Sequence, residues 1–278
     1  MATTIPSEVK EIVTFIFVQD SRGELVPNGT GFFVGVKSKD DHELMHAYLV
    51  TVKHVLQDKS GSYYPSVFIR LNKKAGGAGM IELALRGQNA VPIHMHEDPT
   101  VDLAVLPVLP STDVYEFKVL PDDMLTTKES FKEADIREGD EVFFTGLFTS
   151  FFGAQRNYPV ARFGRVALVT EEKIPWKNVM LDLYLIECQS FGGNSGSPVF
   201  FYLGVTREPG SVIIGGTKLL LAGVMKGSFL DAKEVMIAET SPIALSLENV
   251  GIAAVVPSYK LHETLFSDTL REARSVRQ

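Results

Sequence analysis

Short hydrophobic runs, separated by polar turn residues, follow one another along most of this chain. The runs are rich in β-branched and aromatic residues and are bounded by Gly, Asp, Asn or Pro, which is typical of β-strands. The first half contains these runs: Ile12–Val18, Thr30–Val36, Ala47–Thr51, Ser66–Leu71, Ile81–Leu85 and Leu103–Val108. The second half contains these: Glu141–Gly146, Ala161–Val169, Met180–Glu187, Ser197–Tyr202, Ser211–Ile214, Leu219–Met225 and Gly251–Val256. Many short strands without a repeating helical period predict an all-β fold of antiparallel barrels or sandwiches.

A few segments depart from this strand pattern. Pro6 and Ser7 predict a short helical turn with Ser7 as its N-cap. Residues 110–138 carry prolines and many charges, which predicts a connector between two halves. Leucines after residue 260 recur at roughly helical spacing and predict a C-terminal helix. We therefore divide the chain into a first barrel (8–118), a connector (119–138), a second barrel (139–257) with a long insertion (228–250), and a C-terminal helix (258–278).

The segment 190–200, Ser-Phe-Gly-Gly-Asn-Ser-Gly-Ser-Pro-Val-Phe, carries the strongest chemical signal. A serine hydroxyl such as that of Ser195 becomes a strong nucleophile only when a base removes its proton. The surrounding glycines permit the unusual backbone conformation that aims two amide N–H groups at one oxyanion, and we expect these donors in Gly193 and Ser195. A glycine-rich turn that Ser195 merely caps is the simpler interpretation. The strand–turn–helix elbow of α/β-hydrolases is opposed by Pro198.

A candidate base and a candidate carboxylate precede this serine. His54 stands where a hydrophobic strand gives way to a turn, and an imidazole titrates near working pH. Asp102 directly precedes another hydrophobic strand, where a largely buried carboxylate could fix the histidine tautomer. Asp98, in a more polar and turn-like stretch, is the competing carboxylate. Taken alone, each residue is typical of an ordinary strand end or turn cap, so the hypothesis depends on their combination.

Together, these segments resemble the sequence blocks of the chymotrypsin-like serine proteases. Thr-Val-Lys-His-Val at 51–55 looks like the histidine block, Val-Asp-Leu-Ala-Val-Leu at 101–106 like the aspartate block, and Gly-Gly-Asn-Ser-Gly-Ser-Pro-Val at 192–199 like the serine block. The order His, Asp, Ser is also that of the family. Within it, the chain looks most similar to the bacterial HtrA-type and glutamyl-endopeptidase-like branch, without a PDZ domain. The resemblance implies two six-stranded antiparallel β-barrels of the chymotrypsin type with a C-terminal helix.

The same resemblance implies a serine endopeptidase that hydrolyses peptide bonds through an acyl-enzyme on Ser195. His54 is then the general base and acid, and Asp102 orients His54. The backbone amides of Gly193 and Ser195 form the oxyanion hole. In the trypsin branch an aspartate before the nucleophile pairs with a new N-terminus, whereas this chain has Asn194, so we expect no activation of that kind.

Substrate recognition is also implied by the resemblance. The implied substrate-binding residues are Gln189, Phe191, Gly192, Met225, Lys226 and Gly227. The strand 221–227 is expected to pair with the substrate backbone. The pocket positions hold no acidic residue, so a preference for Arg or Lys is not expected, and the histidine of glutamyl endopeptidases is also missing. We expect a small or medium apolar side chain to be preferred. A catalytically latent or inactive binding or scaffold protein and an esterase are the alternatives.

Composition bears on partners and location. The net charge of −7 and the lack of clustered Lys and Arg argue against nucleic-acid binding. We find neither a signal-peptide pattern nor a membrane-spanning run, and a single cysteine, Cys188, permits no intrachain disulfide. These features predict a cytoplasmic protein that acts on a protein or peptide substrate, and they leave its oligomeric state open. No cofactor is predicted, and no metal, because His94 and His96 beside Asp98 are more typical of hydrogen-bonded residues.

Overall fold

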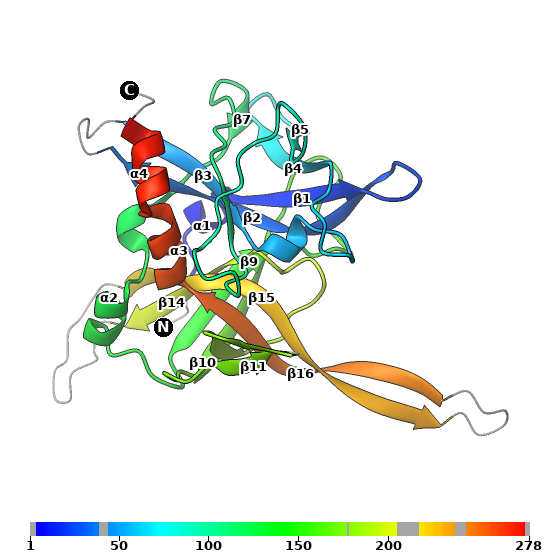
Figure 1. Ribbon diagram of the computed structural model, residues 1–278, viewed down its shortest axis with the longest axis vertical. Coiled ribbons are helices and arrows are strands. Elements are labelled where there is room, and N and C mark those ends of the chain that lie inside the picture. The colour runs from blue at the N-terminus through cyan, green and yellow to red at the C-terminus, as the bar shows by residue number, and fades with distance from the viewer. Residues whose placement is uncertain (1–3, 39–43, 177, 205–216, 237–242, 276–278) are drawn as a thin grey trace.

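The predicted all-β fold is confirmed in the computed structural model, which describes residues 4–38, 44–176, 178–204, 217–236 and 243–275. Two β-structures lie side by side, and helices from the end of the chain pack along one flank (Figure 1). The predicted strand Ser211–Ile214 lies outside the described residues.

The first β-structure is an eight-stranded sheet built from the N-terminal half of the chain. Its main path has the order β5-β4-β1-β2-β3-β6, while the short strands β7 and β8 pair with β4 and β2. All pairs are antiparallel except β2 with β8. The strands are β1 (Val13–Gln19), β2 (Leu25–Lys37), β3 (Met45–Thr51), β4 (Ser66–Lys73), β5 (Ala78–Ala84), β6 (Ala104–Leu106), β7 (Tyr115–Glu116) and β8 (Leu120–Pro121).

The second β-structure is a closed barrel with the order β10-β13-β16-β15-β14-β9, and its strand pairs are antiparallel. The strands are β9 (Glu141–Gly146), β10 (Val160–Leu168), β13 (Tyr184–Glu187), β14 (Pro198–Gly204), β15 (Thr217–Met236) and β16 (Ile243–Pro257). A separate two-stranded flap, β11 (Ile174–Trp176) with β12 (Val179–Leu181), precedes β13. The single strand predicted over Met180–Glu187 is therefore wrong, because the chain leaves the flap after Leu181 and enters the barrel at Tyr184.

The insertion predicted over residues 228–250 is mostly regular structure. It consists of the outer parts of β15 and β16, which remain paired from the barrel out to Met236 and Ile243. This long hairpin extends away from the body of the protein (Figure 1).

Short helices complete the fold. They are α1 (Glu8–Glu11), the 3-10 turns η1 (Lys53–Val55) and η2 (Asp122–Met124), α2 (Lys128–Glu133), α3 (Ser258–Leu265) and α4 (Asp268–Ser275). The Ser7 hydroxyl contacts the Glu8 carboxylate rather than capping a backbone N–H. The one C-terminal helix predicted by leucine spacing is in fact two helices. Phe266 leaves the helical conformation, and Ser267 with Asp268, residue types favoured at helix starts, begins α4.

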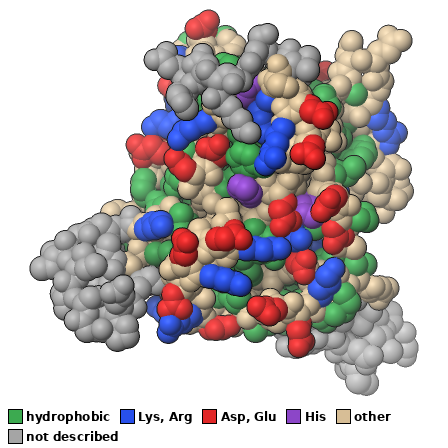
Figure 2. Space-filling view, turned by 60° about the vertical axis from the view of Figure 1, so that its left-hand side comes forward, with side chains coloured by type: hydrophobic (Ala, Val, Ile, Leu, Met, Phe, Trp, Pro, Cys, Tyr) green, Lys and Arg blue, Asp and Glu red, His purple; other side chains and the backbone are tan. Residues whose placement is uncertain are grey.

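One hydrophobic core joins the two β-structures. It contains Phe15, Phe33 and Leu49 from the first sheet together with Phe200 and Leu221 from the barrel. A second cluster fills the barrel interior. On the face drawn in Figure 2, acidic and basic side chains are interspersed over a largely mixed surface. Among the described residues, no helix has both the length and the apolar character needed to cross a bilayer.

Candidate active site

The pairing of β3 with β6 brings His54 and Asp102 together. Thr51 lies opposite Ala104 in this antiparallel register, so continuing the same register places Asp102 beside the residues that follow β3. The chain then tightens into η1, which turns the imidazole of His54 back toward the carboxylate. Strand pairing and the turn at η1 together bring into contact two residues that are 48 positions apart in sequence.

The contact between these residues has the geometry of an oriented general base. His54 Nδ1 lies 2.7 Å from Asp102 Oδ2, and the backbone N–H of His54 donates to Oδ1 at 3.3 Å. Because a carboxylate only accepts, Nδ1 carries the proton and Nε2 presents a lone pair. The His54 side chain is 47% exposed, whereas Asp102 is buried. Burial raises the pKa of Asp102, but the hydrogen bond and charge of His54 together with the Lys226 ammonium outweigh it and hold this pKa below its usual range.

The loop that carries Ser195 is a glycine turn fixed by its own side chains. Asn194 N donates to Phe191 O at 3.1 Å, and Gly193 has a φ of +92°, as the third residue of a type II turn requires. The Asn194 side chain accepts from Phe191 N and donates to Leu147 O, which holds the turn without a charged partner. Within the described chain, neither the Gly193 nor the Ser195 amide has a protein acceptor.

Thr30 of β2, which the sequence analysis missed, docks the serine loop onto the first sheet. Its N–H donates to Ser195 O at 2.9 Å, and its hydroxyl donates to Gly193 O at 2.7 Å while accepting from Leu147 N. Gly196 is required at this junction, because its φ is +87° and a Cβ would lie 2.0 Å from Thr30 O. No motif signalled Thr30, since its role depends on how the two β-structures meet.

The hydroxyl group of Ser195 has a partner other than the imidazole. Ser195 Oγ donates to the backbone carbonyl of Lys226 at 3.1 Å, and no hydrogen bond joins the described Ser195 and His54 side chains. The three segments nevertheless converge, because a Cβ on Gly29 would contact both Val55 and Ser195 O. The structure thus brings His54 to Asp102 and brings Ser195 O close to Val55, the residue that follows His54.

Lys226, predicted to bind substrate, points its side chain into the protein. Its ammonium donates to Asp102 Oδ2 at 2.5 Å, and its side chain is 10% exposed. The ammonium also lies 5.5 Å from the ring centroid of Trp176 in the flap. The sequence placed Lys226 near the site, but it gave no sign that the side chain would reach the carboxylate.

The remaining predicted substrate-binding residues occupy different environments. Gln189, Phe191 and Gly192 are exposed along the serine loop. Met225 is buried, with its side chain in the barrel core, while its N and O pair with Ser197 and Gly196. Gly227 lies against the Trp176 ring.

Polar side chains close the region beneath the serine loop. The hydroxyl groups of Ser190 and Ser228 contact each other, and Asn249 Nδ2 donates to Ser190 O at 2.6 Å. Ser190 is buried, and Ser228 and Asn249 come from the bases of β15 and β16. These three side chains therefore form one hydrogen-bonded group next to the serine loop.

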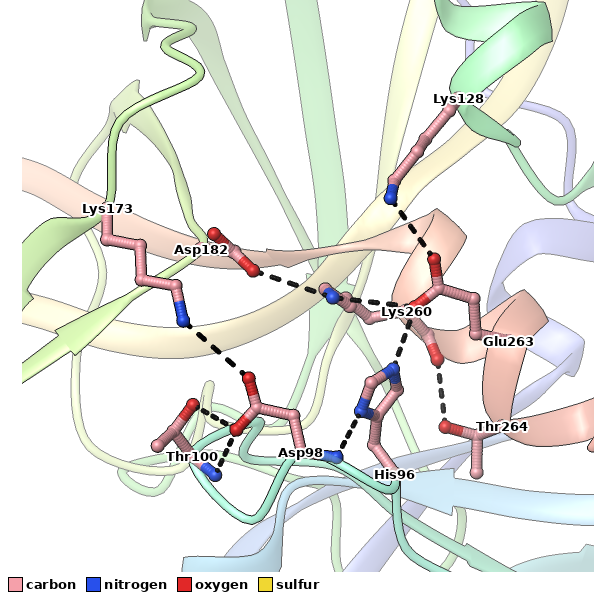
Figure 3. Close-up of polar contacts among 9 residues, drawn as sticks. All are labelled: His96, Asp98, Thr100, Lys128, Lys173, Asp182, Lys260, Glu263 and Thr264. Atoms are coloured by element: carbon pink, nitrogen blue, oxygen red, sulfur yellow. Dashed lines mark hydrogen bonds and ion pairs between the residues drawn. The ribbon is translucent and has the colours of Figure 1, made fainter.

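An ionic network fixes the loop that leads to Asp102 (Figure 3). Asp98, the competing carboxylate, accepts from Thr100 N and Oγ1 and pairs with Lys173 at 3.7 Å, so it caps its own turn. His96 accepts from Asp98 N through Nδ1, and its Nε2 lies 2.7 Å from Glu263 of α3. His96 is thus hydrogen-bonded on both nitrogen atoms, and no group of potential metal ligands is found among the described residues.

Comparisons with known proteins agree with this architecture. Residues 29–204 match the family described as "Trypsin-like peptidase domain". The MamO protease domain from Magnetospirillum magneticum, in its apo form, superposes with a TM-score of 0.52 at 14% identity, over 92% of this chain and 97% of that one. An inactive form of Rv3671c from M. tuberculosis H37Rv superposes with a TM-score of 0.44 at 16% sequence identity, over 95% of each chain. Tobacco etch virus protease superposes with a TM-score of 0.48 at 10% sequence identity, over 97% of this chain and 84% of that one. No curated protein matched.

Proposed function

The chain belongs to the trypsin-like peptidase domain family, and from this premise we propose that it is a serine endopeptidase with His54, Asp102 and Ser195 as its triad. The observation that carries the proposal is the 2.7 Å contact between His54 Nδ1 and Asp102 Oδ2. This contact leaves Nε2 of a half-exposed imidazole as the proposed base for Ser195. A buried carboxylate that fixes the tautomer in this way supports proton abstraction from a serine hydroxyl.

The proposed reaction proceeds through an acyl-enzyme. Rotation of the Ser195 side chain exchanges the Lys226 carbonyl for His54 Nε2 as partner of the hydroxyl. Ser195 Oγ then bonds to the substrate carbonyl carbon while its proton passes to Nε2. The imidazolium gives that proton to the leaving amine as the C–N bond breaks. Water next attacks the ester in the same way, which releases the acid and restores Ser195.

The serine turn supplies electrostatic stabilisation for the tetrahedral intermediates. The unpartnered amides of Gly193 and Ser195 are the proposed donors to the oxyanion. One such donor contributes about 3 kcal/mol to catalysis. Asn194 and Thr30 fix this turn within the folded chain. The proposed oxyanion hole therefore forms without the insertion of a newly cleaved N-terminus.

The proposed substrate is a protein or peptide, bound as an added strand along the inner part of β15. We propose that substrate contacts Gln189, Phe191, Gly192 and the backbone at Met225–Gly227. The Lys226 side chain is directed away from this surface and bonds to Asp102. The hydroxyl groups of Ser190 and Ser228 favour a small, polar side chain next to the scissile bond rather than an apolar one. A single cysteine is consistent with a reducing cytoplasm as the site of action.

A fluorophosphonate probe combined with a peptide library tests this proposal. The wild-type protein should be labelled at Ser195 and should cleave peptides after small polar residues. The variants Ser195→Ala and His54→Ala should lose both properties while keeping the thermal midpoint of the wild type. Cleavage that persists in Ser195→Ala would exclude the proposed nucleophile, and ester turnover without any peptide cleavage would indicate an esterase.

The second candidate is a protease-fold binding or scaffold protein in which catalysis is latent or lost. The hydrogen bond from Ser195 Oγ to Lys226 O favours it, because this contact keeps the nucleophile away from the base. In that case the wild-type protein would resist the probe even though His54 and Asp102 remain in contact.

A further inference from the structure

Lys226 brings a positive charge to the interior of the proposed triad. Strand β15 places it there, because Met225 pairs through both N and O with the serine loop, and Lys226 follows directly. From that position the side chain reaches Asp102 Oδ2 at 2.5 Å. Its backbone carbonyl accepts from Ser195 Oγ, so Lys226 touches two members of the proposed triad.

The ammonium and the imidazole share one carboxylate oxygen. His54 Nδ1 and Lys226 Nζ both lie on Asp102 Oδ2, at 2.7 and 2.5 Å. The two nitrogen atoms are therefore separated by no more than the sum of these lengths. At such a separation a cation strongly affects the protonation of its neighbour.

The contact between Lys226 and Asp102 is largely buried, because the two side chains are 10% and 9% exposed. Trp176 lies over the ammonium, and Phe229 packs edge-on against Trp176 at 4.8 Å. A small cavity beside Asp102 and Lys226 is lined by Leu181, Leu183 and Val256. Charges interact more strongly in such an environment than at the surface.

Other titratable groups face the same carboxylate from neighbouring elements. Lys53 of η1 lies near Asp102 and donates to Pro99 O at 2.6 Å; burial lowers its pKa. Tyr63 faces Asp102 from the loop after η1, and burial raises its pKa. Asp182 lines the small cavity from the other side but pairs with Lys260. Among these described groups, Lys226 is the cation bonded to Asp102.

We infer that Lys226 is a positioning residue that sets the negative charge which Asp102 presents to His54. The inference rests on the proposed function. In a triad the carboxylate stabilises the imidazolium that forms during catalysis. A bonded ammonium offsets much of that charge, so Asp102 stabilises the imidazolium less than a carboxylate without this partner would.

NMR titration of the His54 imidazole tests the inference without requiring activity. The His54→Gln variant assigns the resonance. In Lys226→Met the midpoint should move to higher pH by about one unit. Lys226→Gln keeps a polar but uncharged group next to Asp102, and its titration midpoint should move by the same amount. This variant replaces Lys226→Met in the experiment if the methionine variant does not fold. Lys226→Arg keeps the charge and should titrate like the wild type.

Lys53→Met is the matched control, because it removes a nearby cation that is not bonded to Asp102. Its displacement should be smaller than that of Lys226→Met. If the midpoint is unchanged in both neutral Lys226 variants, or if Lys53→Met moves it as far, the inference is overturned.

The pH dependence of kcat/KM provides a second readout. Its acidic limb should move with the NMR midpoint in Lys226→Met and should stay in place in Lys226→Arg. A wild-type protein that hydrolyses no peptide and resists the probe would contradict the proposed function alone, because the NMR titration would still decide whether Lys226 sets the charge on Asp102.

Discussion

Thr30 connects the first sheet to the serine loop through its backbone N–H and through a hydroxyl group that both donates and accepts. Thr30→Val preserves the shape of the side chain and leaves Gly193 O and Leu147 N without this partner. Because both groups are buried, we expect a loss of about 1–3 kcal/mol in the free energy of unfolding. We also expect lower kcat with little change in KM, since the loop presents the oxyanion donors.

Thr30→Ser is the control for this prediction, because it keeps the hydroxyl and should retain most of the activity. Chemical denaturation gives the free energy of unfolding, and steady-state kinetics on a peptide substrate separates kcat from KM. A valine variant with wild-type kcat and stability would show that the hydroxyl does not hold the loop.

At the scale of single residues, sequence identified the groups that carry recognisable chemistry. His54 lies at the end of a hydrophobic run, and Ser195 lies among glycines that a tight turn requires. The position of Asp102 directly before a hydrophobic strand favours it over Asp98 as the triad carboxylate. The structure gives each aspartate a separate role. Lys226 could not be interpreted in the same way, because a lysine in a strand is ordinarily solvated. Its burial depends on the flap above it.

Among the elements, α3 holds in place the loop that leads to Asp102, through the contact between Glu263 and His96. Glu263 of α3 bonds to His96, and Lys128 and Lys260 pair with the same carboxylate (Figure 3). Burial raises the pKa of Glu263, but its hydrogen bond to His96 and the two lysines outweigh burial and hold the pKa below its ordinary value of 4.5. Such a carboxylate stabilises the fold above its unfolded pKa, and this contribution is lost as pH falls through the folded one.

Glu263→Gln should therefore lower the thermal midpoint at pH 7, because the amide cannot form the ion pairs. The difference from the wild type should shrink as the pH falls below 4.5, where the native carboxyl also takes up a proton. Thermal melts of both proteins across this range measure the difference directly. A difference in thermal midpoint that stays constant with pH would mean that the charge of Glu263 does not contribute to stability.

Elements were predicted well where one hydrophobic pattern belonged to one sheet. The strand predicted over Met180–Glu187 failed because the pattern continues while the chain passes from the flap to the barrel. The flap strand β11 was missed, since Ile174–Trp176 is too short to show alternation. The outer parts of β15 and β16, which stay paired out to Met236 and Ile243, lie in the segment that the sequence analysis interprets as an insertion.

For the molecule as a whole, the proposed boundaries 8–118 and 139–257 cut through a continuous core. Phe33 of the first sheet and Leu221 of the barrel belong to the same buried cluster. The proposed triad also spans the junction, with His54 and Asp102 on one side and Ser195 on the other. The eight-stranded sheet and the barrel are therefore units of topology. The sequence could not show that they share a core, since contacts between distant strands leave no local pattern.

A shared core predicts that both β-structures unfold together. Calorimetry should show one transition, with equal calorimetric and van't Hoff enthalpies. Leu221→Ala tests the junction, because Leu221 is fully buried where the two structures meet. This substitution should lower the stability by about 2–5 kcal/mol while leaving a single transition, since the loss weakens both sides equally. Two resolved transitions in the wild-type protein would show that each β-structure has an independent core, and the triad would then join two separately folding domains.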